Sequence, residues 1–317
     1  MVPISVVMIV KNEETRLHKC LDSLVPYGFE IVIVDTGSED GTLSLAGNYT
    51  DRIFSFPWCD DFSAARNYSL SCASNSFLFM LDADEWVVSI DMEELDYFRK
   101  KLSDQVGVVT RQNMIGNAVG TTDHTERFFS RRHFHYTGRI HEMLTPLRGS
   151  ELPCLLTKTV IGHSGYDMTP EEKAKKALRN ESLLLKELEG PHDPSMEPYY
   201  HYQLGKAAEI TGDYEKACAC FEKALSYQLD PSLAYVEAAV LRFALDSLAL
   251  GRTDDALGIT ALNDLFPASS DFHFVLGEVY RAAGREQEAS EAYRKALLLP
   301  EGSYPHSLIG SRLSRQL

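Results

Sequence analysis

The chain has 317 residues, of which 44% are hydrophobic and 24% charged, a balance that excludes wholesale disorder and allows one large domain or two ordinary ones. Acidic residues outnumber basic ones by 46 to 31, so the formal charge is −15. Such an acidic protein is not expected to bind nucleic acid or an anionic membrane surface. Any anionic ligand would need a local cation or a basic pocket.

The apolar run at residues 2–10 is too short to span a membrane. No basic segment precedes it, and polar residues follow at once. The sequence therefore predicts neither a transmembrane segment nor a secretory signal. Six cysteines without a CxxC pair are typical of free thiols in a reducing compartment, so we expect a cytoplasmic protein.

The first half of the chain alternates apolar strands with helical patterns. Strands are predicted at residues 4–10, 30–35 and 77–82, and helices at 13–25, 39–47 and 62–73. The strands are almost wholly apolar, as in a parallel sheet that is covered on both faces. This rhythm predicts an α/β layer fold that binds ligands at the carboxyl ends of its strands. No G-x-G-x-x-G follows the first strand, so a dinucleotide-binding fold is not favoured.

Polar side chains follow each predicted strand. Asn12 and Glu13 follow the first, Asp35 ends the second, and Asp82 and Asp84 come at the end of the third. Side chains two positions apart on an extended chain project to the same side, so the last two are expected to point together into one crevice. Paired carboxylates suit Mg²⁺ or Mn²⁺. Helix capping is the alternative interpretation, although unpaired acids gathered at one edge cost stability without a ligand.

Residues 127–141 form a basic stretch without a single acid. It contains Arg127, Arg131, Arg132, Arg139, His133, His135 and His141. In a protein of net charge −15, this stretch predicts a loop that faces a diphosphate. A solvated surface run remains the alternative.

The second half becomes helical in period and repeats. Gly205 and Phe221 recur as Gly277 and Tyr293, an offset of 72 residues or two units of 36, and Gly251 marks a degenerate unit between them. The spacing resembles the tetratricopeptide (TPR) repeat, whose stacks bind partners, while an unrelated helical bundle is the alternative. Residues 170–189 predict one long helix that connects the two halves.

Five segments in order, VVMIVKNEE, EIVIVDTGSEDGT, DDFSAARNYSL, FLFMLDADEW and GRIHE, resemble family 2 glycosyltransferases of GT-A fold. The similarity is to the bacterial branch with C-terminal TPR repeats, which includes lipopolysaccharide-type glucosyltransferases and sublancin-type peptide S-glycosyltransferases. We therefore expect an α/β GT-A nucleotide-diphospho-sugar transferase domain at residues 1–168, a linking helix at 169–195, and an all-α TPR helical-repeat domain at 196–317.

This resemblance implies a metal-dependent, inverting transfer of a sugar, expected to be a hexose, from a UDP-sugar to a peptide or a glycan/lipid-linked acceptor. The TPR repeats would dock the acceptor or a protein partner, or mediate self-association. The implied donor-binding residues are Val10, Asn12, Glu13, Asp35, Arg66, Asp82 and Ala83, and the basic stretch adds Arg132 and Arg139. Asp84 would bind Mg²⁺ or Mn²⁺ directly, with Asp82 on the ribose or on a metal-bound water. His163, which follows an apolar segment, is a candidate for a further metal or phosphate ligand on its residue type alone, and a structural histidine is the alternative.

Inverting transfer needs a base that takes the proton of the acceptor. Glu142 is the first acid after the basic stretch and is our candidate, with His141 as the alternative and Asp60 and Asp61 as weaker ones. Two other functions stay open: a TPR scaffold with an inactive transferase-like domain, and a sugar nucleotidyltransferase. KNEE after the first strand lacks the glycine-rich basic loop of the latter class.

Overall fold

The computed structural model describes residues 2–116, 118–164, 169–304 and 306–314. The chain divides into two compact units, Met1–Thr169 and Pro170–Leu317. The long helix predicted between the halves is present as α5 (Pro170–Glu189) and packs against α6 (Glu197–Thr211) within the second unit. The structure thus groups this helix with the repeats, and the predicted division into three parts stays a prediction.

The first unit is built on an eight-stranded mixed sheet in the order β3-β2-β1-β4-β7-β6-β10-β5. These strands are β1 (Ser5–Val10), β2 (Glu30–Asp35), β3 (Ile53–Ser55), β4 (Phe77–Met80), β5 (Glu85–Ser89), β6 (Val106–Ile115), β7 (Ala118–Ser130) and β10 (Cys154–His163). The first four in spatial order run parallel, and β7 joins β4 antiparallel. The predicted α/β layer fold is confirmed, and the antiparallel extension beyond β4 is an addition.

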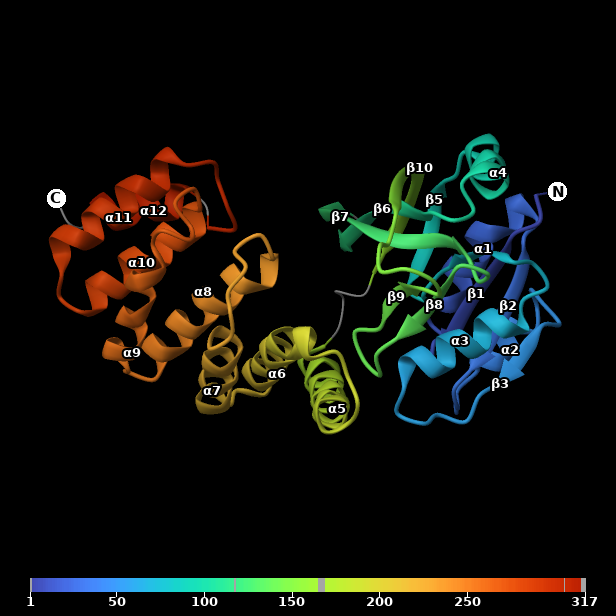
Figure 1. Ribbon diagram of the computed structural model, residues 1–317, viewed down its shortest axis with the longest axis horizontal. Coiled ribbons are helices and arrows are strands. Elements are labelled where there is room, and N and C mark those ends of the chain that lie inside the picture. Colours follow the sequence, from blue (N-terminus) through green and yellow to red (C-terminus); the bar gives the residue numbers. More distant parts are fainter. Residues whose placement is uncertain (1, 117, 165–168, 305, 315–317) are drawn as a thin grey trace. The chain divides into compact units, whose positions relative to one another are not determined.

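Helices and a small hairpin cover both faces of the sheet. They are α1 (Leu17–Leu24), α2 (Thr42–Ala46), α3 (Phe62–Cys72), α4 (Met92–Lys101), the 3₁₀ turn η1 (Val25–Tyr27), β8 (Phe134–Thr137) and β9 (Met143–Pro146). Alternation along the strands sends Met8 and Phe79 into the core under α1 and α4, and Val7 and Met80 into the core under α3, β8 and β9. Figure 1 shows β8 beside α3.

One strand end differs from expectation. β4 stops at Met80, and the next residues form a turn in which the N–H of Glu85 donates to the carbonyl of Asp82 at 3.0 Å. The N–H of Asp82 in turn donates to the carboxylate of Glu85 at 3.1 Å. Asp82 and Asp84 therefore do not lie on an extended chain, and the alternation rule used to align them does not apply.

The second unit consists of helical hairpins. Besides α5 and α6 it contains η2 (Pro194–Met196), α7 (Tyr214–Leu225), α8 (Ala234–Ala249), α9 (Thr253–Leu257), η3 (Gly258–Leu262), α10 (Ser270–Ala282), α11 (Glu286–Leu298) and α12 (His306–Ser314). A Cβ built on Gly205 would lie 2.4 Å from Phe221, and one on Gly277 would lie 2.4 Å from Tyr293. Both hairpins therefore need a glycine for the same close approach, and the repeat predicted from the sequence is confirmed.

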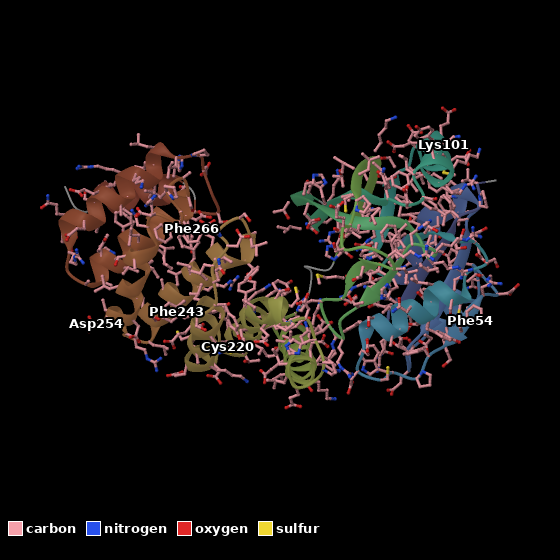
Figure 2. All side chains as sticks on the ribbon, viewed as in Figure 1. Phe54, Lys101, Cys220, Phe243, Asp254 and Phe266 are labelled. Atoms are coloured by element: carbon pink, nitrogen blue, oxygen red, sulfur yellow. The ribbon has the colours of Figure 1, made fainter. Side chains whose placement is uncertain are left out.

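The core of the second unit continues through the middle repeat. Phe243 on α8 and Phe266 before α10 belong to one hydrophobic cluster with the helices α10 and α11 (Figure 2). In the described part of the chain, no helix has both the length and the hydropathy that a membrane crossing requires. All six cysteines are free thiols.

Candidate active site

Three loops of the first unit contain left-handed backbone at residues other than glycine. Among the described residues these are Asn12 (φ 56°), Asp60 (φ 57°) and His141 (φ 52°). Such conformations are uncommon for side chains with a Cβ and must be held by surrounding contacts. The Asn12 side chain, for example, accepts the N–H of Glu39 at 2.8 Å. All three lie in segments that the sequence marked as candidate sites, so local backbone strain coincides with the predicted site.

Arg66 on α3 joins acids from two distant loops. Its Nη2 lies 3.0 Å from Oδ1 of Asp82, and its Nε donates to Oε1 of Glu142 at 2.5 Å. Burial opposes the charge on Arg66, but the two carboxylates outweigh burial and raise the pKa of the guanidinium well above its ordinary value. The predicted base candidate is thus held next to the turn that follows β4.

Asp82 is shared by a second arginine. Nη2 of Arg127 lies 3.3 Å from Oδ2 of Asp82 and 2.7 Å from Oε1 of Glu85, whose side chain is fully buried. Burial disfavours the charged form of Asp82, yet Arg66 and Arg127 outweigh it and hold the pKa well below its usual range. Because two guanidiniums already engage this carboxylate, the structure does not present Asp82 and Asp84 as the expected pair of metal ligands.

Asp84 meets a different partner. Its Oδ2 lies 3.4 Å from Nε2 of His163, which ends β10. The antiparallel register places His163 opposite Glu85, so the sheet brings this histidine to the turn after β4. Nδ1 of His163 lies 2.8 Å from Oδ1 of Asn113 on β6. The structure therefore brings together two of the residues predicted to bind a metal.

The described residues offer few protein ligands to a divalent cation. No three Asp, Glu, His or Cys side chains of the described residues are grouped to hold a metal ion. Asp84 and His163 offer one carboxylate oxygen and one imidazole nitrogen, which suit Mn²⁺ or Mg²⁺ when substrate phosphates and water supply the remaining ligands.

Glu13 adds a second observation in favour of a cation. Its Oε2 is buried and has no hydrogen-bond partner among the described residues, although Arg16 lies 3.7 Å away. Burial, with the charges of Asp84, Asp40 and Asp82, raises the pKa of Glu13 to about 7 against the opposing effect of Arg16. The surplus of negative charge is what a bound cation would relieve, so the residues present fit the group.

Two of the predicted nucleoside-binding residues form hydrogen bonds with the loop after β2. The carbonyl of Val10 accepts both the N–H and the Oγ1 hydroxyl of Thr36. The Asp35 carboxylate accepts the N–H groups of Gly37 at 3.0 Å and Ser38 at 3.1 Å. Ala83 is buried in the core. Their roles in donor binding stay predictions.

The arginines of the basic stretch lie in two different places. Arg127 belongs to the network around Asp82, but Arg132 follows the end of β7, where Ser130 pairs with Phe77 at the beginning of β4. Arg132 lines a cavity of about 810 Å³ together with His133 and Arg148. Because β7 is antiparallel to β4, Arg132 lies near the beginning of β4, whereas Asp84 follows the end of that strand, and a contact of Arg132 with the diphosphate stays a prediction.

Arg139 and Asp61 both accept hydrogen bonds from the first turn of α3. The carbonyl of Arg139 accepts the N–H of Phe62 at 2.8 Å, and Asp61 caps the helix by accepting the N–H of Ala64 at 2.9 Å. Asp60 accepts the indole N–H of Trp58 at 2.8 Å. Asp61 therefore has a structural role, as the weaker ranking of this residue anticipated.

Sequence reasoning missed four polar residues next to the site. Glu85, Arg111, Asn113 and Asp123 form a continuous chain of ion pairs and hydrogen bonds from Arg127 to His163. Glu85 directly follows the Asp82-Ala83-Asp84 motif, and the alternation of Arg111 and Asn113 along β6 was a signal of one polar strand face. Only the sheet register shows that this face meets the site.

The sheet with parallel strands β3 to β4, an acidic turn after β4 and an antiparallel extension is a GT-A-like architecture, and a TPR-type helical region follows it. Residues 5–150 match the model of glycosyl transferase family 2, and residues 198–230 and 270–302 match models of the tetratricopeptide repeat. The first unit is therefore similar to family 2 glycosyltransferases over residues 5–150, and the second unit is similar to tetratricopeptide repeats over two segments.

Two relatives illustrate the similarity. The lipopolysaccharide core biosynthesis glycosyltransferase LpsC of Rhizobium meliloti is 40% identical over 88 residues, which cover 26% of this chain and 32% of LpsC. The glycosyltransferase SunS of Bacillus subtilis is 26% identical over 194 residues, which cover 58% of this chain and 46% of SunS. The chain spans less than half the length of the curated relatives it matches. Among solved structures, residues 1–349 of S. aureus TarS align with a TM-score of 0.41 and 13% identity over 92% of this chain and 91% of that one.

Proposed function

We propose that the chain is a metal-dependent, inverting glycosyltransferase that moves a hexose from a UDP-sugar to an acceptor. The observation that carries the proposal is the meeting of two pairs around the turn after β4. Asp84 lies 3.4 Å from His163, and Arg66, which binds Asp82 of the same turn, also holds Glu142. Asp84, Arg66 and Glu142 lie within residues 5–150, which match the family 2 model. His163 lies after this segment in the sequence, but β10 pairs it with Glu85 in the sheet.

In this proposal Asp84 and His163 would hold Mg²⁺ or Mn²⁺, and the donor diphosphate would supply further ligands. The bound ion would neutralise the negative charge that develops on the UDP leaving group. Glu13 and Asp35 would orient the nucleoside from the loops after β1 and β2. Arg66 and Arg127 keep Asp82 ionised and its turn rigid, so that Asp84 is presented in one position.

Glu142 is the proposed base. Arg66 binds its Oε1, and the described residues give Oε2 no hydrogen-bond partner, so Oε2 is the oxygen that would accept the proton of the acceptor. Attack from the side of Glu142, opposite the leaving diphosphate, inverts the anomeric centre. His141 would orient this loop through its left-handed backbone, with a direct role as base the alternative.

The acceptor is proposed to be a peptide or a glycan/lipid-linked group, and the TPR repeats to dock it, a protein partner or a second copy of the chain. The name of LpsC describes lipopolysaccharide core biosynthesis, which belongs to the second of these classes. We also place the protein in the cytoplasm, because its six free thiols suit a reducing compartment.

Hydrolysis of the donor without an acceptor tests the proposal. Purified protein is incubated with UDP-hexoses, and with GDP-hexoses as comparison, in the presence of Mn²⁺, Mg²⁺ or EDTA. We expect slow release of UDP that EDTA abolishes and Mn²⁺ restores, and a loss of about 100-fold or more in Asp84→Asn. Asp104→Asn is the matched control, because Asp104 is exposed and lines the cavity of Arg132 rather than the proposed site. Equal rates with EDTA and in Asp84→Asn would refute the metal assignment.

One observation favours a second function. Asp82 is engaged by two arginines, as expected of a domain that has become a structural part of a TPR scaffold. A scaffold would neither bind UDP in the presence of Mn²⁺ nor hydrolyse any sugar nucleotide, so the same assay with calorimetric UDP binding separates the two functions.

A further inference from the structure

A polar chain without an assigned role lies behind His163. The sheet register pairs His163 with Asn113 across β10 and β6, and Arg111 with Asp123 across β6 and β7. Because residues paired in this way, and residues two apart on one strand, share a face of the sheet, these four side chains lie on one face. Asn113 is only 2% exposed. Its amide is the connection between Asp123 and the histidine.

Asp123 determines how the Asn113 amide is oriented. Arg111 binds Asp123 through two hydrogen bonds of 2.9 Å, and these together with Asn113 outweigh burial and lower the pKa of the carboxyl below its ordinary value. An ionised carboxylate can only accept hydrogen bonds. Oδ2 of Asp123 lies 3.1 Å from the amide of Asn113, so the NH₂ group must face it and the amide oxygen must point the other way.

The oriented amide in turn selects the tautomer of His163. Oδ1 of Asn113 lies 2.8 Å from Nδ1 of His163, and a carbonyl oxygen can only accept. Nδ1 must therefore carry a hydrogen. In the neutral imidazole the lone pair is then on Nε2, which lies 3.4 Å from Oδ2 of Asp84. These two atoms would then both offer electron pairs to a cation bound next to them.

We propose that Asn113, oriented by Asp123, is a positioning residue that keeps His163 in the Nδ1–H tautomer and so presents Nε2, next to Asp84, to a divalent cation. The inference rests on the proposed function, since it needs His163 as a metal ligand. Partners behind metal-binding histidines typically change metal affinity by 10–100-fold when they are removed. Neither Asn113 nor Asp123 belongs to the motifs that identify the family 2 domain in this chain.

Asp123→Asn is the first variant. Its amide can offer either an oxygen or an NH₂ group to Asn113, so the amide of Asn113 loses its fixed orientation while the shape of the site is kept. ¹⁵N NMR of the imidazole is recorded on the metal-free protein at about pH 8, where an ordinary histidine is neutral. His163→Gln identifies the signal. We expect the wild type to show Nδ1–H alone, the variant to show both tautomers, and its affinity for Mn²⁺ in calorimetry to fall about 10-fold.

Two further variants complete the test. The double exchange of Asn113→Asp with Asp123→Asn places a carboxylate, which can only accept, next to Nδ1 of His163, and the new amide at position 123 can donate to that carboxylate. We expect this exchange to recover the Nδ1–H tautomer and most of the Mn²⁺ affinity. Thr121→Val is the matched control, because Thr121 also contacts the amide of Asn113, at 3.3 Å, but its hydroxyl can donate or accept and cannot orient it. We expect Thr121→Val to change neither readout.

The outcomes separate this inference from the proposed function. Nε2–H in the wild type, or an unchanged tautomer in Asp123→Asn, would overturn the positioning role whatever the activity of the enzyme. Full Mn²⁺ affinity in His163→Gln would instead remove His163 from the metal site, and the positioning role with it. Loss of Mn²⁺ affinity in Asp123→Asn without recovery in the exchanged pair would point to a general structural effect and also contradict the inference.

Discussion

The two units of the chain differ in the contacts on which the comparison below depends: ion pairs in the first unit and close packing in the second. The first unit encloses ion pairs around the turn after β4, where Arg66 and Arg127 bind Asp82 and Arg127 also binds Glu85. In the second unit, glycines on α6 and α10 pack closely against aromatic rings on α7 and α11. Desolvated ion pairs contribute little net stability and are typical of sites that must meet charged ligands, whereas close packing mainly stabilises. Substitutions in the first unit should therefore change chemistry, and those in the second should change stability.

The largest expected effect is that of Glu142→Gln. The amide oxygen can still accept from Nε of Arg66, so we expect donor binding and the midpoint of thermal unfolding to stay close to wild type. Without a carboxylate to take the proton, transfer should slow by about 100- to 10,000-fold. Product formation with an accepted substrate and UDP binding by calorimetry check this.

His141→Asn is the companion variant, because asparagine tolerates the left-handed backbone at this position. A loss of transfer in His141→Asn with full activity in Glu142→Gln would move the base by one residue. A large drop in stability for Glu142→Gln would contradict the contrast between the two units.

Gly277→Ala tests the packing of the second unit. Its new methyl group would lie 2.4 Å from the Tyr293 ring, so helix α10 or the ring must shift. We expect a loss of about 1–3 kcal/mol of stability, with donor hydrolysis by the folded protein unchanged. Urea unfolding monitored by circular dichroism measures it. The control is Gly258→Ala, where a Cβ meets nothing within 4 Å and the stability should stay the same or rise slightly. Equal losses in both variants would show that the close approach is not what matters.

The smallest expected effect concerns a carboxyl group buried between helices of the second unit. Asp246 on α8 is 6% exposed, and burial, followed by the neighbouring charge of Glu209, raises its pKa to about 7. A carboxyl whose pKa is raised in the folded state stabilises the fold at pH values below its unfolded pKa of about 4 and loses this contribution as the pH rises through 7.

Asp246→Asn removes the ionisation, so we expect the variant to be more stable than wild type by about 1 kcal/mol at pH 8 and equally stable near pH 4. The midpoint of thermal unfolding across this pH range measures the difference. Parallel curves for the two proteins would show that Asp246 does not titrate in the folded state. This variant sharpens the comparison, because it removes from the second unit a buried carboxyl that costs stability when ionised and belongs to no proposed ligand site.

Sequence patterns predicted the parts whose local signal is strong. The apolar runs that became β1, β2 and β4 and the helix at 170–189 were found because their patterns are continuous. β6, β7 and β10 were missed, since they are long but only partly buried and carry polar residues at many positions. The residues that complete the site, such as Asn113, come from these strands.

By itself the sequence determined where apolar strands begin, which residues follow them, and that Gly205 and Gly277 hold equivalent places in a repeat, because these properties depend on neighbours along the chain. Only the tertiary structure decided the partners of the acids. Because β7 is antiparallel to β4, Arg132 lies near the beginning of β4, whereas Asp84 follows its end. The register of β10 against β5 places His163 next to that aspartate. The physical reason is that a charged side chain acquires its role from the groups that replace its water, and those groups come from distant parts of the chain.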